Sequence, residues 1–218
     1  LSCVDLFLSS PLQNQTNYSL SFSNISDCSG NAVSPSAISF SYYIPGFNDL
    51  VIDEIMADPD PAVGLPAFEF IEIHNRSSYP IGLKNFSVST PTTSKLLPDV
   101  IILPDSFFVF TGTSGYQAYS GFGISVAQVT SFPALTNTGS TITIKNPQGK
   151  IIHSLTYSDT WYQDPQKSEG GFTLEMIDTD NPCGGAENWR ASLDIAGGTP
   201  GRRNSVNAAN PDKIGRAH

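Results

Sequence analysis

Two neighbouring segments constrain the fold of this chain most: Val51–Pro59 (VIDEIMADP) and Phe68–Asn75 (FEFIEIHN). Each is a short apolar run that contains carboxylates, and turn-forming Pro, Gly and Asp residues surround both. Glu and Asp are poor strand formers and are costly to bury. The two runs therefore predict either strands with one solvent face, or a polar cluster whose hydrogen bonds the fold must supply.

Short strands of this kind continue along the chain from Leu50 to about Val206. They are separated by turn signals and show little helical periodicity, which predicts an antiparallel β-sandwich. The predicted strands are Val51–Met56, Phe68–His74, Phe86–Ser89, Val100–Leu103, Phe107–Thr111, Thr141–Lys145, Ile151–Tyr157, Thr173–Ile177 and Trp189–Ala191.

The N-terminal part forms a separate compositional block with predicted strands at Cys3–Ser9, Asn17–Ile25 and Ala37–Ile44. The last two show a clear period of two. Three strands are too few for a sandwich of their own, so we expect this β segment to pack on, or link to, the next domain. We divide the chain into residues 1–45, 46–206 and 207–218, the last a polar tail or linker.

The charge balance excludes several classes of partner. Asp and Glu total 20 against 11 Lys and Arg, a net charge of −9. Phosphate backbones and anionic lipid surfaces reward clustered basic residues, so we expect no nucleic acid and no membrane docking. No apolar run approaches the roughly 18–20 residues that a membrane span needs.

The same composition indicates where the protein works. Only 14% of residues are charged, while Ser, Thr and Asn are abundant. Hydroxyl-rich and amide-rich surfaces are typical of extracellular all-β proteins, so we expect an exported protein, extracellular or at the cell surface. The chain begins at Leu1, and we interpret it as a piece of a longer protein; a mature product after signal removal is the alternative.

Three cysteines leave the thiol chemistry open. Cys3 and Cys28 flank the first predicted strands, so a disulfide between them is our expectation. Cys183 could instead pair with Cys28, or all three could remain thiols. No cysteine or histidine cluster has zinc-ligand spacing.

Two resemblances follow from particular motifs. Tyr18–Phe22 (YSLSF) followed by Asp27–Asn31 (DCSGN) resembles the closing half of bacterial Ig-like modules. VIDEIMADP and FEFIEIHN, followed by Ile81–Phe86 (IGLKNF), are similar to the opening of bacterial lamin-tail domains. Further motifs in the same order are Leu103-Pro104, Asn188-Trp189, Gly197–Gly201 (GGTPG) and Asn204-Ser205.

The lamin-tail resemblance covers roughly residues 48–206, with Phe86 where the family usually has Trp. It implies an Ig-like β-sandwich that is not an enzyme, within an exported multidomain protein. It does not fix what the domain binds.

The acidic residues supply the candidate sites. Asp58 and Asp60 predict a calcium-binding loop, because hard cations take clustered carboxylates and carbonyls. Glu54, Glu69 and Glu72 instead predict a structural polar cluster, in which a buried glutamate accepts backbone N–H bonds or pairs with Arg190. Asp178–Asn181 is a second loop of the calcium type. Apart from calcium we expect no cofactor.

We therefore expect a non-catalytic module for protein binding, adhesion or spacing. Its partners would be a protein or glycan at the cell surface and other domains of the same polypeptide. The alternative is a carbohydrate-binding accessory module of a secreted hydrolase, with loop aromatics as a sugar platform. These aromatics are Tyr116, Tyr119, Phe122, Trp161 and Tyr162.

Overall fold

The structure is a computed structural model that describes residues 6–32, 34 and 36–208. The chain divides into two compact units, Leu1–Ile44 and Pro45–His218, and each is described by itself. The sequence analysis placed this boundary between residues 45 and 46.

The first unit contains one antiparallel pair, β1 (Thr16–Ser21) and β2 (Ala37–Tyr42). Tyr18 and Phe40 lie opposite each other and stack, with ring centroids 5.6 Å apart. The predicted strand Cys3–Ser9 is wrong over its described part, residues 6–9, which belong to no strand. Leucine and phenylalanine side chains there are exposed, so no packed neighbour stabilises an extended conformation.

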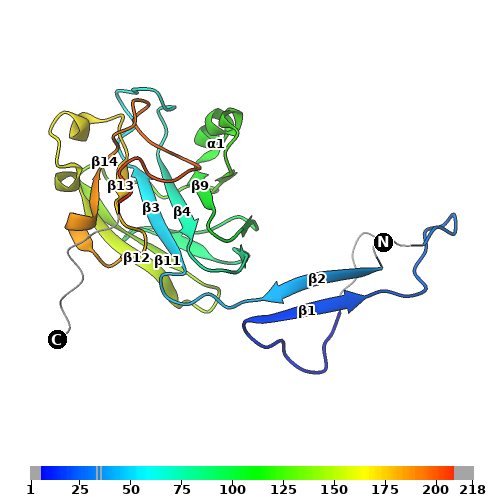
Figure 1. Ribbon diagram of the computed structural model, residues 1–218. Helices are drawn as coiled ribbons and strands as arrows, with labels where there is room; N and C mark the ends of the chain where they lie inside the picture. Colours follow the sequence, from blue (N-terminus) through cyan, green and yellow to red (C-terminus); the bar gives the residue numbers. More distant parts are fainter. Residues whose placement is uncertain (1–5, 33, 35, 209–218) are drawn as a thin grey trace, which may run out of the picture. The chain divides into compact units, whose positions relative to one another are not determined.

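The second unit is built on a six-stranded sheet in the order β10-β9-β4-β3-β13-β14 (Figure 1). Neighbours are antiparallel except β9 and β10, which are parallel. The strands are β3 (Leu50–Met56), β4 (Phe70–Asn75), β9 (Phe107–Thr111), β10 (Val126–Gln128), β13 (Leu174–Met176) and β14 (Trp189–Ala191).

A four-stranded antiparallel sheet, in the order β12-β11-β6-β7, forms the second layer. Its strands are β6 (Ser87–Ser89), β7 (Ser94–Leu96), β11 (Gly139–Lys145) and β12 (Ile151–Ser158). A short additional pair consists of β5 (Ile81–Gly82) and β8 (Ile101–Ile102). The helical elements are α1 (Thr113–Tyr119), η1 (Ser120–Phe122), η2 (Asp159–Tyr162), η3 (Lys167–Glu169) and η4 (Gly185–Asn188).

The two faces of the six-stranded sheet differ in what they bury. Side chains alternate along β4, so Ile71 and Ile73 face one side while Glu72 and His74 face the other. The isoleucines contribute to the apolar core, which includes Ile142 and Ile144 of β11. The opposite face carries a separate apolar cluster of Met56, Leu65, Phe70, Val109 and Tyr119 beside α1.

These observations confirm an all-β, Ig-like sandwich. Every predicted strand between Val51 and Ala191 corresponds to an observed one; the ends of β9 and β14 match and the others are shifted. The elements α1, β5, β7 and β10 were not predicted. The helix is only seven residues long, contains a glycine and has no side-chain N-cap, so it carries no usable periodic signal.

Candidate binding site

Three glutamates stand side by side across the centre of the six-stranded sheet. Glu54 of β3 lies opposite Glu72 of β4 on one side and opposite Glu175 of β13 on the other. Residues directly opposite in an antiparallel pair share a face, so all three side chains lie on the same side of the sheet. Asp53 precedes Glu54 at a break in the β3–β4 register, where a bulge re-aims a side chain. We call these four residues the carboxylate cluster.

The carboxylate cluster is sealed from water by a segment that returns from the far end of the sequence. All four side chains have 0% exposure. Residues 197–206, which we call the closing segment, run across them, and Figure 1 shows this orange-to-red stretch passing over β3 and β13.

Hydrogen bonds from the closing segment end on the glutamates. The Thr199 N–H donates to Glu54 Oε1 at 2.7 Å, and its hydroxyl donates to Glu175 Oε1 at 2.9 Å. The Gly201 N–H donates to Glu72 Oε2. Glu175 Oε2 accepts from the Ser205 hydroxyl at 2.7 Å and the Val206 N–H at 3.1 Å. The buried glutamates are therefore the anchor points of this segment.

Backbone groups of the sheet hold the same segment. The Asn204 side-chain amide donates to the carbonyls of Asp53 and Met176, both at 2.9 Å. Thr173, at the start of β13, donates its hydroxyl to Glu54 Oε1 at 2.7 Å.

The cluster carries more carboxylates than donors. Burial raises the pKa of Asp53 and Glu72 well above their usual range, and neighbouring carboxylates raise them further. Burial and the charge of Glu175 raise the pKa of Glu54 to about 8. Within the part of the chain that the structure describes, no lysine or arginine forms an ion pair with these four residues. At neutral pH the cluster therefore retains protons.

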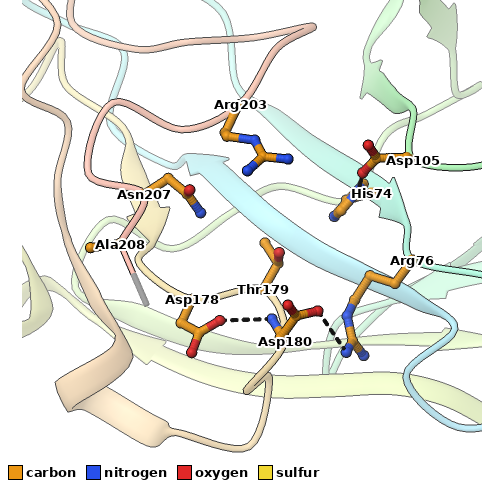
Figure 2. A pocket seen from close by; sticks show the side chains of 9 residues that line it. All are labelled: His74, Arg76, Asp105, Asp178, Thr179, Asp180, Arg203, Asn207 and Ala208. Atoms are coloured by element: carbon orange, nitrogen blue, oxygen red, sulfur yellow. Dashed lines mark hydrogen bonds and ion pairs between the residues drawn. The ribbon is translucent and has the colours of Figure 1, made fainter. Parts of the chain in front are cut away.

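A polar cavity opens where the closing segment ends. Its volume is about 320 Å³. Figure 2 shows its lining: His74, Arg76, Asp105, Asp178, Thr179, Asp180, Arg203, Asn207 and Ala208.

Most of the charges that line this cavity are already paired. His74 Nε2 lies 3.1 Å from Asp105 Oδ1, and the His74 ring stacks on Phe107. Desolvation lowers the pKa of His74, which favours the neutral ring. Arg76 lies 3.4 Å from Asp180.

Arg203 is the exception among the cavity's cations. In Figure 2 its guanidinium lies across the cavity from the Arg76–Asp180 pair. The structure shows no ion pair or hydrogen bond from this guanidinium to any of the residues it describes. Arg203 is thus a cation of the cavity whose guanidinium has no direct ion pair among the described residues.

The predicted polar cluster is divided between two places. Glu54 and Glu72 lie in the carboxylate cluster. Glu69 lies apart, half-buried, and its Oε1 accepts from the Leu135 N–H at 3.2 Å. Arg190 lies opposite Glu175 in the register but is exposed, and over residues 6–208 as described it has no ion pair with a glutamate.

Sequence reasoning missed Asp53 and Glu175 as members of the cluster. A signal for Glu175 existed, since Thr173–Ile177 (TLEMI) places a carboxylate inside an apolar run just as the two opening segments do. The role of the closing segment had no local signal, because Glu54 and Glu72 lie more than a hundred residues upstream and Glu175 lies 24 residues before Thr199.

The predicted calcium loops remain predictions. Asp58 is half-buried and its carbonyl accepts from the Gly171 N–H at 2.8 Å, while Asp60 is exposed. In the second loop, the Asn188 amide donates to the carbonyls of Asp178 and Asn181. In the described residues, no group of three or more His, Cys, Asp or Glu side chains is arranged to hold a metal ion.

The cysteine prediction falls partly outside the described residues. Cys28 and Cys183 are exposed, and among the described residues neither forms a disulfide. Cys3 is not among the residues that the structure describes, so its pairing with Cys28 stays a prediction.

The loop aromatics do not form one platform. Tyr119 and Tyr162 are buried and donate their hydroxyls to the carbonyls of Pro66 and Phe172. Trp161 packs beside Trp189, with ring centroids 6.0 Å apart. Tyr116 and Phe122 are exposed.

Over the residues described, no helix is long and apolar enough to cross a membrane.

No curated protein matches the chain. A family model described as the Lamin Tail Domain matches residues 45–159, just over half of the chain. β3, β4 and both long strands of the second sheet lie in this range, while β13, β14 and the closing segment follow it. With the Ig-like sandwich of the second unit, this match shows that the chain belongs to the lamin tail domain family.

Proposed function

We propose that this chain is a non-catalytic recognition module of an exported multidomain bacterial protein. Lamin tail domains are generally non-catalytic, Ig-like units. The module serves in protein binding or adhesion, and its partner docks at the cavity beside the closing segment. The observation that carries this proposal is the unpaired guanidinium of Arg203 in that cavity.

The charge of Arg203 selects the chemistry of the partner. Asp105 is hydrogen-bonded to the His74 ring and Asp180 pairs with Arg76, so the ion pairs of the described residues leave the Arg203 guanidinium open to a partner. A guanidinium presents its N–H donors in a fork that matches a carboxylate bidentately. The module therefore binds a protein partner through an acidic side chain.

The position of Arg203 is fixed before the partner arrives. Gly201 and Asn204, on either side of it, are both hydrogen-bonded to the sheet. A preformed donor loses little conformational freedom on binding, which favours affinity.

Arg203→Gln tests this proposal, with Arg202→Gln as the matched control. Arg202 is the neighbouring residue, pairs with Asp194 at 2.6 Å and does not line this cavity. The full chain and both variants are assayed by biolayer interferometry against arrays of acidic and neutral peptides and glycans. Arg203→Gln should weaken binding to acidic ligands about tenfold or more, since a hydrogen bond to a charged group contributes about 1.5–3 kcal/mol. Arg202→Gln should bind as the wild type does. Equal effects of the two substitutions, or binding that does not depend on ligand charge, would contradict the proposal.

A carbohydrate-binding accessory module of a secreted hydrolase is the second candidate. It is favoured by the lining of the cavity, which consists almost wholly of hydrogen-bonding side chains and suits sugar hydroxyls. The discriminating probes are uronic acid oligosaccharides, as free acids and as methyl esters. Binding of the free acids without binding of acidic peptides would replace the protein-binding proposal with this one.

Export to the cell surface is part of the proposal. It is supported by the low content of charged residues and the abundance of hydroxyl side chains. Intact cells of the source organism, treated with protease and probed with an antibody to this chain, should lose the signal. A signal that survives until the cells are lysed would exclude export.

Calcium at Asp58 and Asp60 remains a separate proposal. A cation that binds the folded state raises the unfolding temperature by mass action. The full chain, treated with chelator, is melted with and without added calcium. No shift at millimolar calcium, or an equal shift in Asp58→Asn, would remove the loop as a site.

A further inference from the structure

We propose that the closing segment is a proton-dependent latch, held on the sheet while the carboxylate cluster keeps its protons and released as the cluster ionises. Release would dismantle the cavity that contains Arg203. This last step rests on the proposed function, whereas the latch itself does not.

The carboxylate cluster has fewer hydrogen-bond donors than oxygens. The four carboxylates have eight oxygens. Four of them accept hydrogen bonds: Glu54 Oε1, Glu72 Oε2 and both oxygens of Glu175. The other four are buried without a partner: both oxygens of Asp53, Glu54 Oε2 and Glu72 Oε1.

A buried ionised carboxylate can only accept, so unpartnered oxygens are expensive. A protonated carboxyl group has a donor of its own and can share it with a neighbouring carboxylate. Carboxylates that share one dry site cannot all ionise. Retained protons therefore replace the missing donors.

The elements packed against the cluster bring no compensating charge. From the sheet, His74 of β4 lies on the face of Glu72 and Arg190 of β14 lies opposite Glu175, but over the described residues neither forms an ion pair with the four acids. From the closing segment, Arg202 lowers the pKa of Glu54, but its guanidinium pairs with Asp194. From α1, Tyr119 is the titratable neighbour, and burial, followed by the charge of Glu54, raises its pKa.

Opening of the latch exposes the carboxylates to water, where they ionise with ordinary pKa values near 4. The closed state thus holds more protons than the open state. Its advantage is complete below about pH 4 and is lost as the pH rises towards the pKa of Glu54, about 8. Between these limits the opening equilibrium shifts about tenfold per pH unit for each proton retained.

Opening would act directly on the proposed binding site. Arg203 lies between Gly201 and Asn204, and Asn207 follows three residues later; both Arg203 and Asn207 line the cavity. Releasing the bonds to Glu72 and to the Asp53 and Met176 carbonyls would free the backbone on both sides of Arg203, while Asn207 keeps its side-chain hydrogen bond to the Ile177 carbonyl at 3.2 Å.

Trypsin provides a direct probe, since Arg202 and Arg203 place two cleavage sites in the latch. Cleavage there is followed by mass spectrometry on the full chain from pH 6 to 9, with rates normalised to a small trypsin substrate at each pH. The wild-type rate should rise at least tenfold over this range. The variant Asp53→Asn/Glu54→Gln/Glu72→Gln cannot ionise at these positions, and its rate should be independent of pH.

Two further variants are measured in the same trypsin assay, one inside the carboxylate cluster and one outside it. Asp53→Asn alone removes no hydrogen bond to another residue, and it should make the pH dependence shallower even if the triple variant does not fold. Glu69→Gln removes a half-buried glutamate outside the cluster and should leave the wild-type profile unchanged.

A flat wild-type profile, or an unchanged profile in Asp53→Asn, would overturn the latch. The proposed function fails separately: a pH-dependent latch together with full binding by Arg203→Gln would reject the cavity but keep the latch.

Discussion

His153 shows how a single side chain joins the two layers. It lies on β12, and its Nδ1 accepts the Ile52 N–H of β3 at 3.1 Å, where the backbone is fully buried. Desolvation lowers the pKa of His153 to about 4. The neutral ring is thus required, since a proton on Nδ1 would remove the acceptor.

We expect His153 to destabilise the fold in acid. The unfolded ring takes up a proton below about pH 6.5 and the folded ring only near 4, so stability is lost as the pH falls between these values. The loss amounts to about 3 kcal/mol by pH 4. Urea unfolding of wild type and His153→Asn at pH 7 and pH 4.5 measures it. Asn keeps an acceptor near the Nδ1 position but cannot titrate here, so its loss should be smaller; identical losses would show that His153 does not cause the effect.

At the scale of elements, the closing segment depends on a close approach to the sheet. Gly198 is buried, and a Cβ there would lie 2.7 Å from Glu54 Oε1 and 2.8 Å from Leu65 Cδ1. Glu54 Oε1 accepts the Thr199 N–H and Leu65 belongs to the buried apolar cluster, so neither can move without loss of a contact.

Gly198→Ala should therefore destabilise the second unit by about 1–3 kcal/mol through overpacking. Gly82→Ala is the control, because a Cβ at Gly82 meets nothing within 4 Å. Thermal unfolding of both variants checks this. A melting temperature that falls equally in the two would mean that the close approach at Gly198 has no special role.

At the scale of the whole molecule, the two units differ in what can stabilise them. The second unit has two packed layers and a buried core. The first has one antiparallel pair, with Ile38 and Phe40 exposed, and an isolated pair of strands is marginal in water.

Residues 45–208 should consequently fold without residues 1–44. We expect the melting temperature of this shorter chain to match the main transition of the full chain within about 2 °C, less than the effect of 1 kcal/mol on a domain of this size. Circular dichroism melts of both chains give the comparison. A markedly lower value would show that the first unit stabilises the second.

Structural features could be predicted from the sequence where the pattern that indicates them lies within one segment. β3 and β4 follow from apolar runs between turns, and the period of two on β4 places Glu72 and Phe70 on one face. The same reasoning could not pair Glu72 with Gly201, because a hydrogen bond across 129 positions leaves no pattern in either segment.

By itself, then, the sequence determined the all-β class, the lamin-tail character of the second unit and the presence of carboxylates inside strands. Only the tertiary structure decided which carboxylates meet. The β3–β4 and β3–β13 registers bring Glu54, Glu72 and Glu175 together, and the bulge adds Asp53. The closing segment then seals them from water. Burial and mutual charge, which arise only when distant strands pair, turn ordinary acids into a site that must hold protons.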